Sequence, residues 1–248
     1  MKNNIVLAML AHVDSGKTTL SEAMLYLSGS IRKLGRVDHK DAFLDTYSME
    51  KDRGITIFSK QAMFGWKDLD IALLDTPGHV DFSAEMERTL QVLDYAILVI
   101  SGPAGIQSHT ETVWRLLKRY NVPVFIFVNK MDIGDCQKDE IMSGIIERFG
   151  SECVDFTCET GDEFFENIAM CDEDVLEKYM DSGNIDDEDI RKLIFERKLV
   201  PCYFGSALKL DGVEEILDGL EKYTLKKEYP NEFGAKVYKV SRDDKNKR

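Results

Sequence analysis

The residues best suited to chemistry lie in one short segment near the N-terminus, AHVDSGKTT at residues 11–19. The segment has the spacing of a phosphate-binding loop, or P-loop, except that Ala11 stands where the first glycine is usual. In such a loop, consecutive backbone N–H groups surround the α- and β-phosphates of a nucleotide. Lys17 would reach the β- and γ-phosphates, and the Thr18 hydroxyl would bind Mg²⁺. The pattern therefore predicts a site for a nucleoside triphosphate.

Two later segments supply groups that a nucleotide-dependent switch needs around the γ-phosphate. RGITI at residues 53–57 contains Thr56, which can close over the γ-phosphate and Mg²⁺ when the preceding loop becomes ordered. DTPGH at residues 75–79 follows an apolar strand. Asp75 is therefore expected near the metal, which it would bind through water, and Gly78 near the γ-phosphate.

Two further segments predict which base is bound. NKMD at residues 129–132 ends another apolar strand, and the two acceptor oxygens of Asp132 match the N1–H and amine donors of guanine but not the edge of adenine. GSA at residues 205–207 ends a short strand, where the Ala207 N–H can meet the guanine O6. The residues expected to bind the nucleotide are Asp14, Ser15, Gly16, Lys17, Thr18, Thr19, Thr56, Asp75, Gly78, Asn129, Lys130, Asp132, Ser206, Ala207 and Leu208. The expected Mg²⁺ ligands are Thr18, Thr56 and Asp75.

Taken together, AHVDSGKTT, RGITI, DTPGH, NKMD and GSA resemble the five elements of the translational GTPases, and the resemblance covers the whole chain. The P-loop with leading Ala and His is similar to that of elongation factor G. Within this group the chain looks most like the tetracycline-resistance ribosomal protection proteins, through residues 6–35, KDRGITI and LEKYM at 176–180. Elongation factor G has a similar LEKY-type segment and the same DTPGH, so those residues do not separate the two.

The resemblance implies a reaction and a partner. His79 occupies the place where other GTPases use a glutamine to orient the attacking water, so His79 and Lys17 are the expected catalytic residues for hydrolysis of GTP to GDP and phosphate. Asp14 matches a family position associated with a monovalent cation near the phosphates, and its alternative role is to hold the shape of the loop. The expected partner is the ribosome, both its RNA and its proteins, contacted through the full-length protein.

Other functions stay open at this point. Within the translational group, the alternatives to ribosomal protection are elongation factor G and the factor that recycles peptide-release factors. A P-loop GTPase of a non-translational branch is disfavoured by His79 and by an insert described below. A GTP-binding module that does not hydrolyse its ligand is the third alternative.

Composition sets further bounds. The 248 residues can hold one α/β domain with an insert, and the formal net charge of −13 argues against RNA binding through the average field of this domain. Local patches, or further domains, would then contact the ribosome. With no apolar run near 18 residues, we expect no membrane contact. We also expect a cytoplasmic, monomeric protein that does not bind DNA, and its cysteines show no CxxC spacing. Reduced thiols are expected at Cys136, Cys153, Cys158, Cys171 and Cys202.

The alternation of apolar strands and helical patterns predicts a doubly wound α/β fold with a mostly parallel sheet. The connection from Ser28 to Gly54 is too long for an ordinary loop, and we interpret it as the first switch. Strands are expected near 4–10, 55–65, 70–75, 95–101, 123–129 and 201–205, and helices near 17–27, 81–92, 109–120, 138–149 and 212–223.

The domain prediction assigns residues 1–229 to a GTP-binding domain. About 70 residues separate Asp132 from Gly205, where one helix and one strand need roughly 30, so an inserted subdomain is expected at about 150–197, before the last strand. Its acidic runs, CDED at 171–174 and DDED at 186–189, are typical of helix starts. A calcium loop would need a pattern that they lack. Residues 230–248 are expected to form a linker and the first strand of a truncated β-barrel.

The remaining histidines and the aromatic residues receive no chemical role. His12 is expected to be structural, and His39 and His109 to be exposed. The spacing of the aromatic residues predicts packing in the core, as for Phe43, Trp66 and Trp114.

Overall fold

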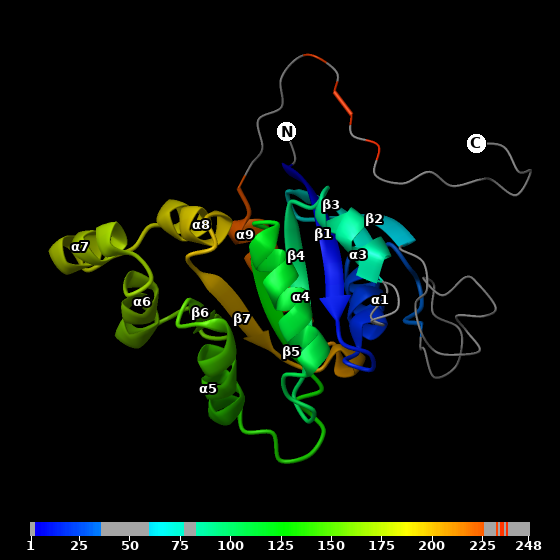
Figure 1. Cartoon of the computed structure of the whole chain (residues 1–248), viewed down its shortest axis with the longest axis horizontal. Helices are drawn as coiled ribbons and strands as arrows, with labels where there is room; N and C mark the ends of the chain where they lie inside the picture. The colour runs from blue at the N-terminus through cyan, green and yellow to red at the C-terminus, as the bar shows by residue number, and fades with distance from the viewer. Residues whose placement is uncertain are drawn as a thin grey trace, which may run out of the picture.

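The computed structural model describes residues 3–35, 60–76 and 83–225, together with four residues between 232 and 237. A seven-stranded sheet runs through the centre of the molecule, with helices on both faces (Figure 1). The strands are β1 (Asn3–Ala11), β2 (Lys60–Trp66), β3 (Leu69–Asp75), β4 (Tyr95–Ser101), β5 (Val124–Asn129), β6 (Cys153–Asp155) and β7 (Val200–Phe204). The helices are α1 (Lys17–Leu27), α3 (Ser83–Leu90), α4 (Ser108–Arg119), α5 (Lys138–Phe149), α6 (Asp162–Ala169), α7 (Glu173–Ser182), α8 (Asp187–Phe195) and α9 (Val213–Tyr223), with a 3₁₀ helix η3 (Ala207–Lys209).

The sheet confirms the predicted fold class. Its order is β2-β3-β1-β4-β5-β7-β6, and every neighbouring pair is parallel except β2 and β3. The central strands β4 and β5 are buried along their whole length, because helices cover both faces of a parallel sheet. A strand order that runs outward in both directions from β1 is the doubly wound arrangement.

Two apolar cores lie on opposite faces of the sheet. One core is formed with α1, α9 and the helices α6 to α8, and the other with α3, α4 and α5. Trp114 of α4 stacks on Phe149 of α5 with ring centroids 4.6 Å apart, and Trp66 packs against the first core while its indole N–H donates to Asp218 at 2.8 Å. The packing role predicted for these two tryptophans is confirmed, whereas Phe43 lies outside the described residues.

The parallel strands bring their carboxyl ends to one edge of the sheet, the lower edge in Figure 1. The turn after β1 leads into α1, and the turns after β5 and β7 lie beside it. In an open α/β sheet, ligands bind at this edge, where the loops after the strands converge. No helix in the described part of the chain has both the length and the apolar character needed to cross a membrane.

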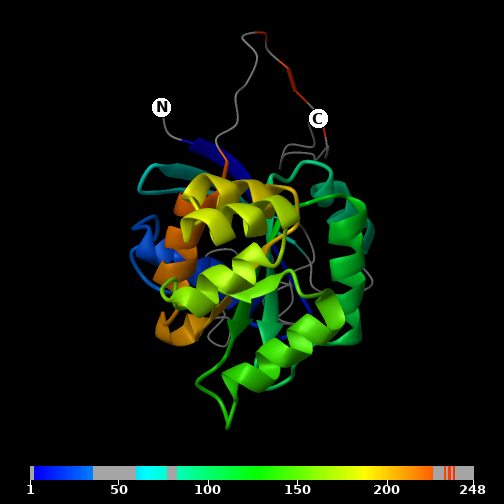
Figure 2. The same cartoon turned by 90° about the vertical axis from the view of Figure 1, so that its left-hand side faces the viewer.

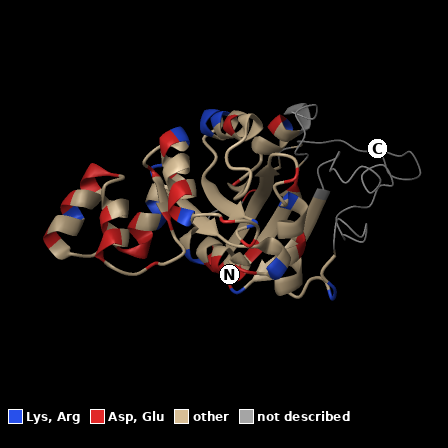
Figure 3. Ribbon diagram, turned by 90° about the horizontal axis from the view of Figure 1, so that it is seen from below, with Lys and Arg blue, Asp and Glu red and all other residues tan. Residues whose placement is uncertain are grey.

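The helices α6, α7 and α8 extend from one end of the sheet, and Figure 2 views the molecule from that side. Acidic residues are frequent on these helices (Figure 3). Asp172 caps α7, because its carboxylate accepts from the backbone N–H groups of Asp174 and Val175. Asp186 is at the N-cap position of α8, yet its carboxylate pairs with Lys178 at 2.8 Å. The acidic runs therefore mark helix starts, as predicted.

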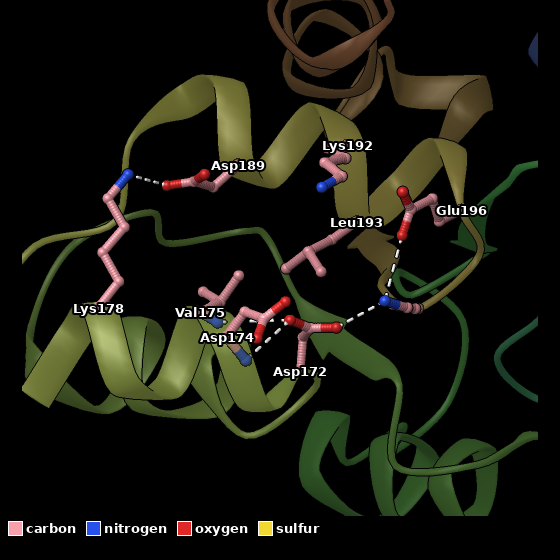
Figure 4. Close-up of a pocket in the computed structure, with 9 residues that line it drawn as sticks. Asp172, Asp174, Val175, Lys178, Asp189, Lys192, Leu193 and Glu196 are labelled. Carbon is pink, nitrogen blue, oxygen red and sulfur yellow. Dashed lines mark hydrogen bonds and ion pairs between the residues drawn. The ribbon is translucent and has the colours of Figure 1, made fainter.

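A crevice of about 160 Å³ separates α7 from α8 (Figure 4). Its charged groups largely pair with one another. Lys178 contacts Asp189 at one end, and Lys198 contacts Asp172 and Glu196 at the other, at 2.7 and 3.2 Å. The pair of Lys178 with Asp189 joins α7 to α8, and the pair of Lys198 with Asp172 joins the segment after α8 to the start of α7.

The structure differs from expectation at two points. Residues 153–155, expected within the insert, form β6, which pairs with β7 and ends the sheet, so the helical part of the insert begins only at α6. The expectation that His109 is exposed is wrong, since it is 6% exposed and lies on the inward face of the first turn of α4. His39, the segment 36–59 and nearly all of 226–248 lie outside the described residues, so the predictions for a first switch, a linker and a barrel strand remain predictions.

Candidate functional site: a nucleotide-binding edge

The phosphate loop is shaped by backbone conformations that its sequence permits. Asp14 adopts a left-handed φ of 61°, and Gly16, which precedes α1, has a φ of 89°. The Ser15 N–H donates to the His12 carbonyl at 3.2 Å, which closes a tight turn. A Cβ on residue 16 would stand 2.2 Å from Nδ2 of Asn129. Glycine is therefore required here both by conformation and by the close approach of a second loop.

Lys17 and Asp75 form a buried ion pair at the centre of this edge. The Lys17 residue is 7% exposed and Asp75 is 0% exposed, and the Lys17 ammonium donates to Asp75 Oδ1. The next residue, Thr76, donates its hydroxyl to the Met9 carbonyl at 2.7 Å, which fixes the end of β3 against β1. Two opposite charges out of water stabilise each other, and losing either would leave the other uncompensated. The pair thus brings together two residues that the sequence predicted for the phosphates and the metal ion.

Asn129 joins three loops that are distant in sequence. Its Nδ2 donates to the Ser15 carbonyl at 3.0 Å, and its Oδ1 accepts from the Ala207 N–H at 2.9 Å and from the Lys130 N–H at 2.8 Å. The side chain is almost fully buried, with 2% of the residue exposed. Both polar atoms of the amide therefore hold the phosphate loop beside the loops that follow β5 and β7.

Lys130 adds a second link between the same loops. It adopts a left-handed φ of 66°, and its ammonium donates to the Asp14 carbonyl at 2.6 Å. A non-glycine residue in this conformation is held there by its surroundings. The contact ties the NKMD turn to the phosphate loop.

Asp132 lies in the turn after β5 with its carboxylate held by two donors. The Ser206 hydroxyl donates to it, Lys209 Nζ lies 3.2 Å from Oδ2, and these groups lower the pKa of Asp132, the hydrogen bond from Ser206 having the larger effect. The lowered pKa keeps the carboxylate ionised at neutral pH, so that it acts only as a hydrogen-bond acceptor. Lys209 was not among the predicted site residues, although it directly follows the Ser206-Ala207-Leu208 run.

The loop after β7 is closed by tight backbone packing. A Cβ at Gly205 would stand 2.2 Å from the Asp211 carbonyl oxygen, and one at Gly212 would stand 2.4 Å from that of Phe204. Ala207 is fully buried, with its N–H on Asn129, whereas the Leu208 side chain is 46% exposed at the rim. The loop thus exposes an apolar residue next to Lys209, which contacts Asp132.

The structure brings together most of the predicted residues that it describes. Thr18 and Thr19 lie in the first turn of α1, half-buried beside Lys17. His12, in the phosphate loop, has its ring centroid 6.0 Å from that of His109, an approach that sequence reasoning did not foresee. Thr56, Gly78 and His79 lie outside the described residues.

The donor set fits a hard divalent cation with a triphosphate. Mg²⁺ prefers oxygen ligands and keeps several waters, and Thr18 and Asp75 supply a hydroxyl and a carboxylate at the same edge. Lys17 and Asp75 form an ion pair there, so the same edge carries a cation suited to phosphates and a carboxylate suited to a metal ion. Together, fold and site define a P-loop nucleotide-binding domain.

Comparisons with known proteins identify the branch. Residues 2–226 match the family of the elongation factor Tu GTP binding domain, and the chain belongs to this family of GTPases. It is 35% identical to the tetracycline resistance protein TetP of Clostridium perfringens, over 100% of this chain and 42% of that protein. It is also 35% identical to elongation factor G of Thermotoga maritima, over 88% of this chain and 38% of that protein.

A solved structure supports the fold. The crystal structure of ttk003000868 from Thermus thermophilus matches with a TM-score of 0.80 at 22% identity, over 91% of this chain and 40% of that one. The chain therefore spans about two fifths of the length of the relatives that it matches.

Proposed function

We propose that this chain is the GTP-hydrolysing domain of a ribosome-dependent translation factor. The observation that carries the proposal is the junction at Asn129, which joins the phosphate loop at Ser15 to the base loop at Ala207. This junction sets the spacing between a phosphate-binding and a base-binding element on one rigid edge. Family membership and the elongation factor G relatives support the assignment to translation.

In the proposed reaction, each described residue has a distinct task. Asp132 and the Ala207 N–H read guanine, and the backbone N–H groups of the phosphate loop hold the α- and β-phosphates. Lys17 exchanges its contact with Asp75 for the β- and γ-phosphates, where its charge stabilises the developing negative charge. Asp14 is proposed to face a monovalent cation near the phosphates.

Thr18, Asp75 and Thr56 would hold Mg²⁺, which would supply positive charge to neutralise the phosphates. His79 is proposed to position the water that attacks the γ-phosphate in line, once the ribosome fixes its segment. The γ-phosphate bond to the β-phosphate oxygen breaks as the water oxygen attacks, giving GDP and phosphate.

The first test uses the chain itself and then the whole protein. The chain should bind GDP and not ADP in calorimetry, and ribosomes should stimulate hydrolysis by the whole protein. His79→Ala should leave GDP affinity nearly intact but lower ribosome-stimulated turnover by about 10² to 10⁴, the range for losing a positioned acid–base group.

Lys17→Ala is the contrasting variant, because Lys17 contacts phosphates in the ground state as well. It should weaken GDP binding itself. Full ribosome-stimulated turnover in His79→Ala would overturn the translational mechanism and favour another GTPase branch, and binding without any hydrolysis on ribosomes would favour a binding module.

Within translation, we propose ribosomal protection against tetracycline as the specific role. The support is the extent of the TetP match, which covers all of this chain, against 88% for the elongation factor G of T. maritima at equal identity. The whole protein should raise the tetracycline concentration that inhibits growth and release the drug from ribosomes when GTP is present. Catalysis of translocation without drug release would instead indicate elongation factor G, and splitting of post-termination complexes a recycling factor.

A further inference from the structure

Lys209 stands beside the carboxylate expected to read guanine. Its Nζ lies 3.2 Å from Oδ2 of Asp132, while the Ser206 hydroxyl donates to the same carboxylate. The Asp132 side chain is 20% exposed and the Lys209 side chain 63% exposed, so the ammonium approaches from the solvent side. The carboxylate is thus held between a buried hydroxyl and an outer cation.

Backbone hydrogen bonds fix the position of the Lys209 main chain, from which its side chain extends. It ends the 3₁₀ turn η3, its N–H donates to the Ser206 carbonyl at 3.0 Å, and Leu210 closes the turn with a left-handed φ of 62°. Ser206 is further paired with Asp211 through both backbone groups at 3.0 Å. The origin of the lysine side chain is therefore rigid, unlike that of a lysine on a free loop.

The hydrogen-bond donors of guanine suggest a role for the contacts of Ser206 and Lys209 with Asp132. A carboxylate offers about four acceptor positions, and guanine uses two of them through N1–H and the 2-amino group. Ser206 and Lys209 can occupy the other two, which fixes the orientation of the carboxylate. When a base covers Asp132 and removes water, the retained cation also compensates the charge that would otherwise be costly to bury.

We propose that Lys209 is a positioning residue for base selection, which orients the Asp132 carboxylate toward the 2-amino and N1–H edge of guanine. The inference rests on the proposed guanine-nucleotide function. It adds a specificity residue outside the five motifs. Lys209 acts through Asp132, so its effect depends on the carboxylate and on the base, and not on the phosphates.

The test is a double-mutant cycle at Lys209 and Asp132, in which the affinities for GDP, IDP and XDP are measured by calorimetry. Lys209→Met should weaken GDP binding about 5-fold, the upper range for one ion pair, and Lys209→Arg should retain most of the affinity. IDP lacks the 2-amino group and uses fewer acceptors on Asp132, so its affinity should fall less and the GDP-to-IDP preference should shrink. In an Asp132→Asn background, which favours XDP, adding Lys209→Met should leave XDP affinity unchanged.

A matched control is Lys67→Met, which removes an exposed lysine that follows β2 and pairs with Asp218 at 2.6 Å, and it should leave all affinities unchanged. An equal loss for GDP, IDP and XDP in both backgrounds would overturn the proposal, because Lys209 would then act on the phosphates or on the fold. Wild-type GDP affinity in Lys209→Met would overturn it as well. If the wild-type chain bound no GDP, the proposed function itself would fail.

Discussion

The nucleotide-binding edge and the α6–α8 insert use polar residues in opposite ways. At the edge, buried groups bridge long sequence separations, as Asn129 does between Ser15 and Ala207. In the insert, exposed charges pair with near neighbours in the chain, as Lys178 does with Asp186 and Asp189. A buried polar group must keep its partners, whereas an exposed ion pair contributes little net energy. The structure of the edge therefore depends on individual polar contacts. The structure of the insert depends mainly on its apolar packing and on the residues that start its helices.

The largest contrast is expected at a single carboxylate. Asp132→Asn should weaken GDP binding by up to roughly 10⁴ to 10⁵, because the amide presents a donor to the guanine N–H groups, and it should admit XDP. Asp189→Asn is the matched change in the insert, where it removes one of two partners of Lys178. Its GDP affinity should equal that of the wild type in calorimetry. Unchanged GDP affinity in Asp132→Asn would contradict the proposal that Asp132 binds guanine.

A second contrast compares two glycines with positive φ. Gly16→Ala should lower the free energy of unfolding by about 3 kcal/mol, because the left-handed backbone strain adds to a Cβ 2.2 Å from Asn129 Nδ2. Gly183 in the insert has a φ of 68° but open space where a Cβ would stand, so Gly183→Ala should cost about 1 kcal/mol. Urea denaturation measures both. Equal losses would show that Asn129 does not press on the phosphate loop.

The smallest effect concerns pH and the cap of α7. The Lys198 ammonium and the backbone N–H groups of α7 lower the pKa of Asp172, the contact with Lys198 having the largest effect. A carboxylate with a depressed folded pKa contributes stability above its unfolded pKa of about 4, and this is lost as the pH falls through the folded value.

At neutral pH, Asp172→Ala should therefore cost about 1 kcal/mol, as for other N-caps. The difference from the wild type should shrink as the pH falls below about 4, because the unfolded wild-type chain binds a proton at Asp172 before the folded protein does. Urea denaturation at pH 7 and at acid pH measures this difference. A constant difference across that range would show that the ionised cap is not its source.

The sequence predicted the element order well because apolar periodicity follows burial. The strands β1, β4 and β5 are continuous apolar runs, and the helices α1 and α5 lie where the 3.6-residue pattern predicts them. The pattern is weak for β6, a strand of three residues, which looks like part of an insert until its pairing with β7 is seen. The prediction for His109 was also wrong because it rested on local sequence alone. A polar residue in a first helical turn is usually solvated, whereas His109 is buried by tertiary packing.

The sequence by itself determined the candidate residues for phosphate and base binding, because nucleotide chemistry demands fixed residue types at fixed spacings along the chain, and their roles remain predictions. Only the tertiary structure decided which of these residues touch. The pairing of Lys17 with Asp75, the junction at Asn129 and the approach of Lys209 to Asp132 join residues between 58 and 114 positions apart. Such contacts depend on which parallel strands are neighbours in the sheet. The spacing of motifs along the chain does not determine that spatial order.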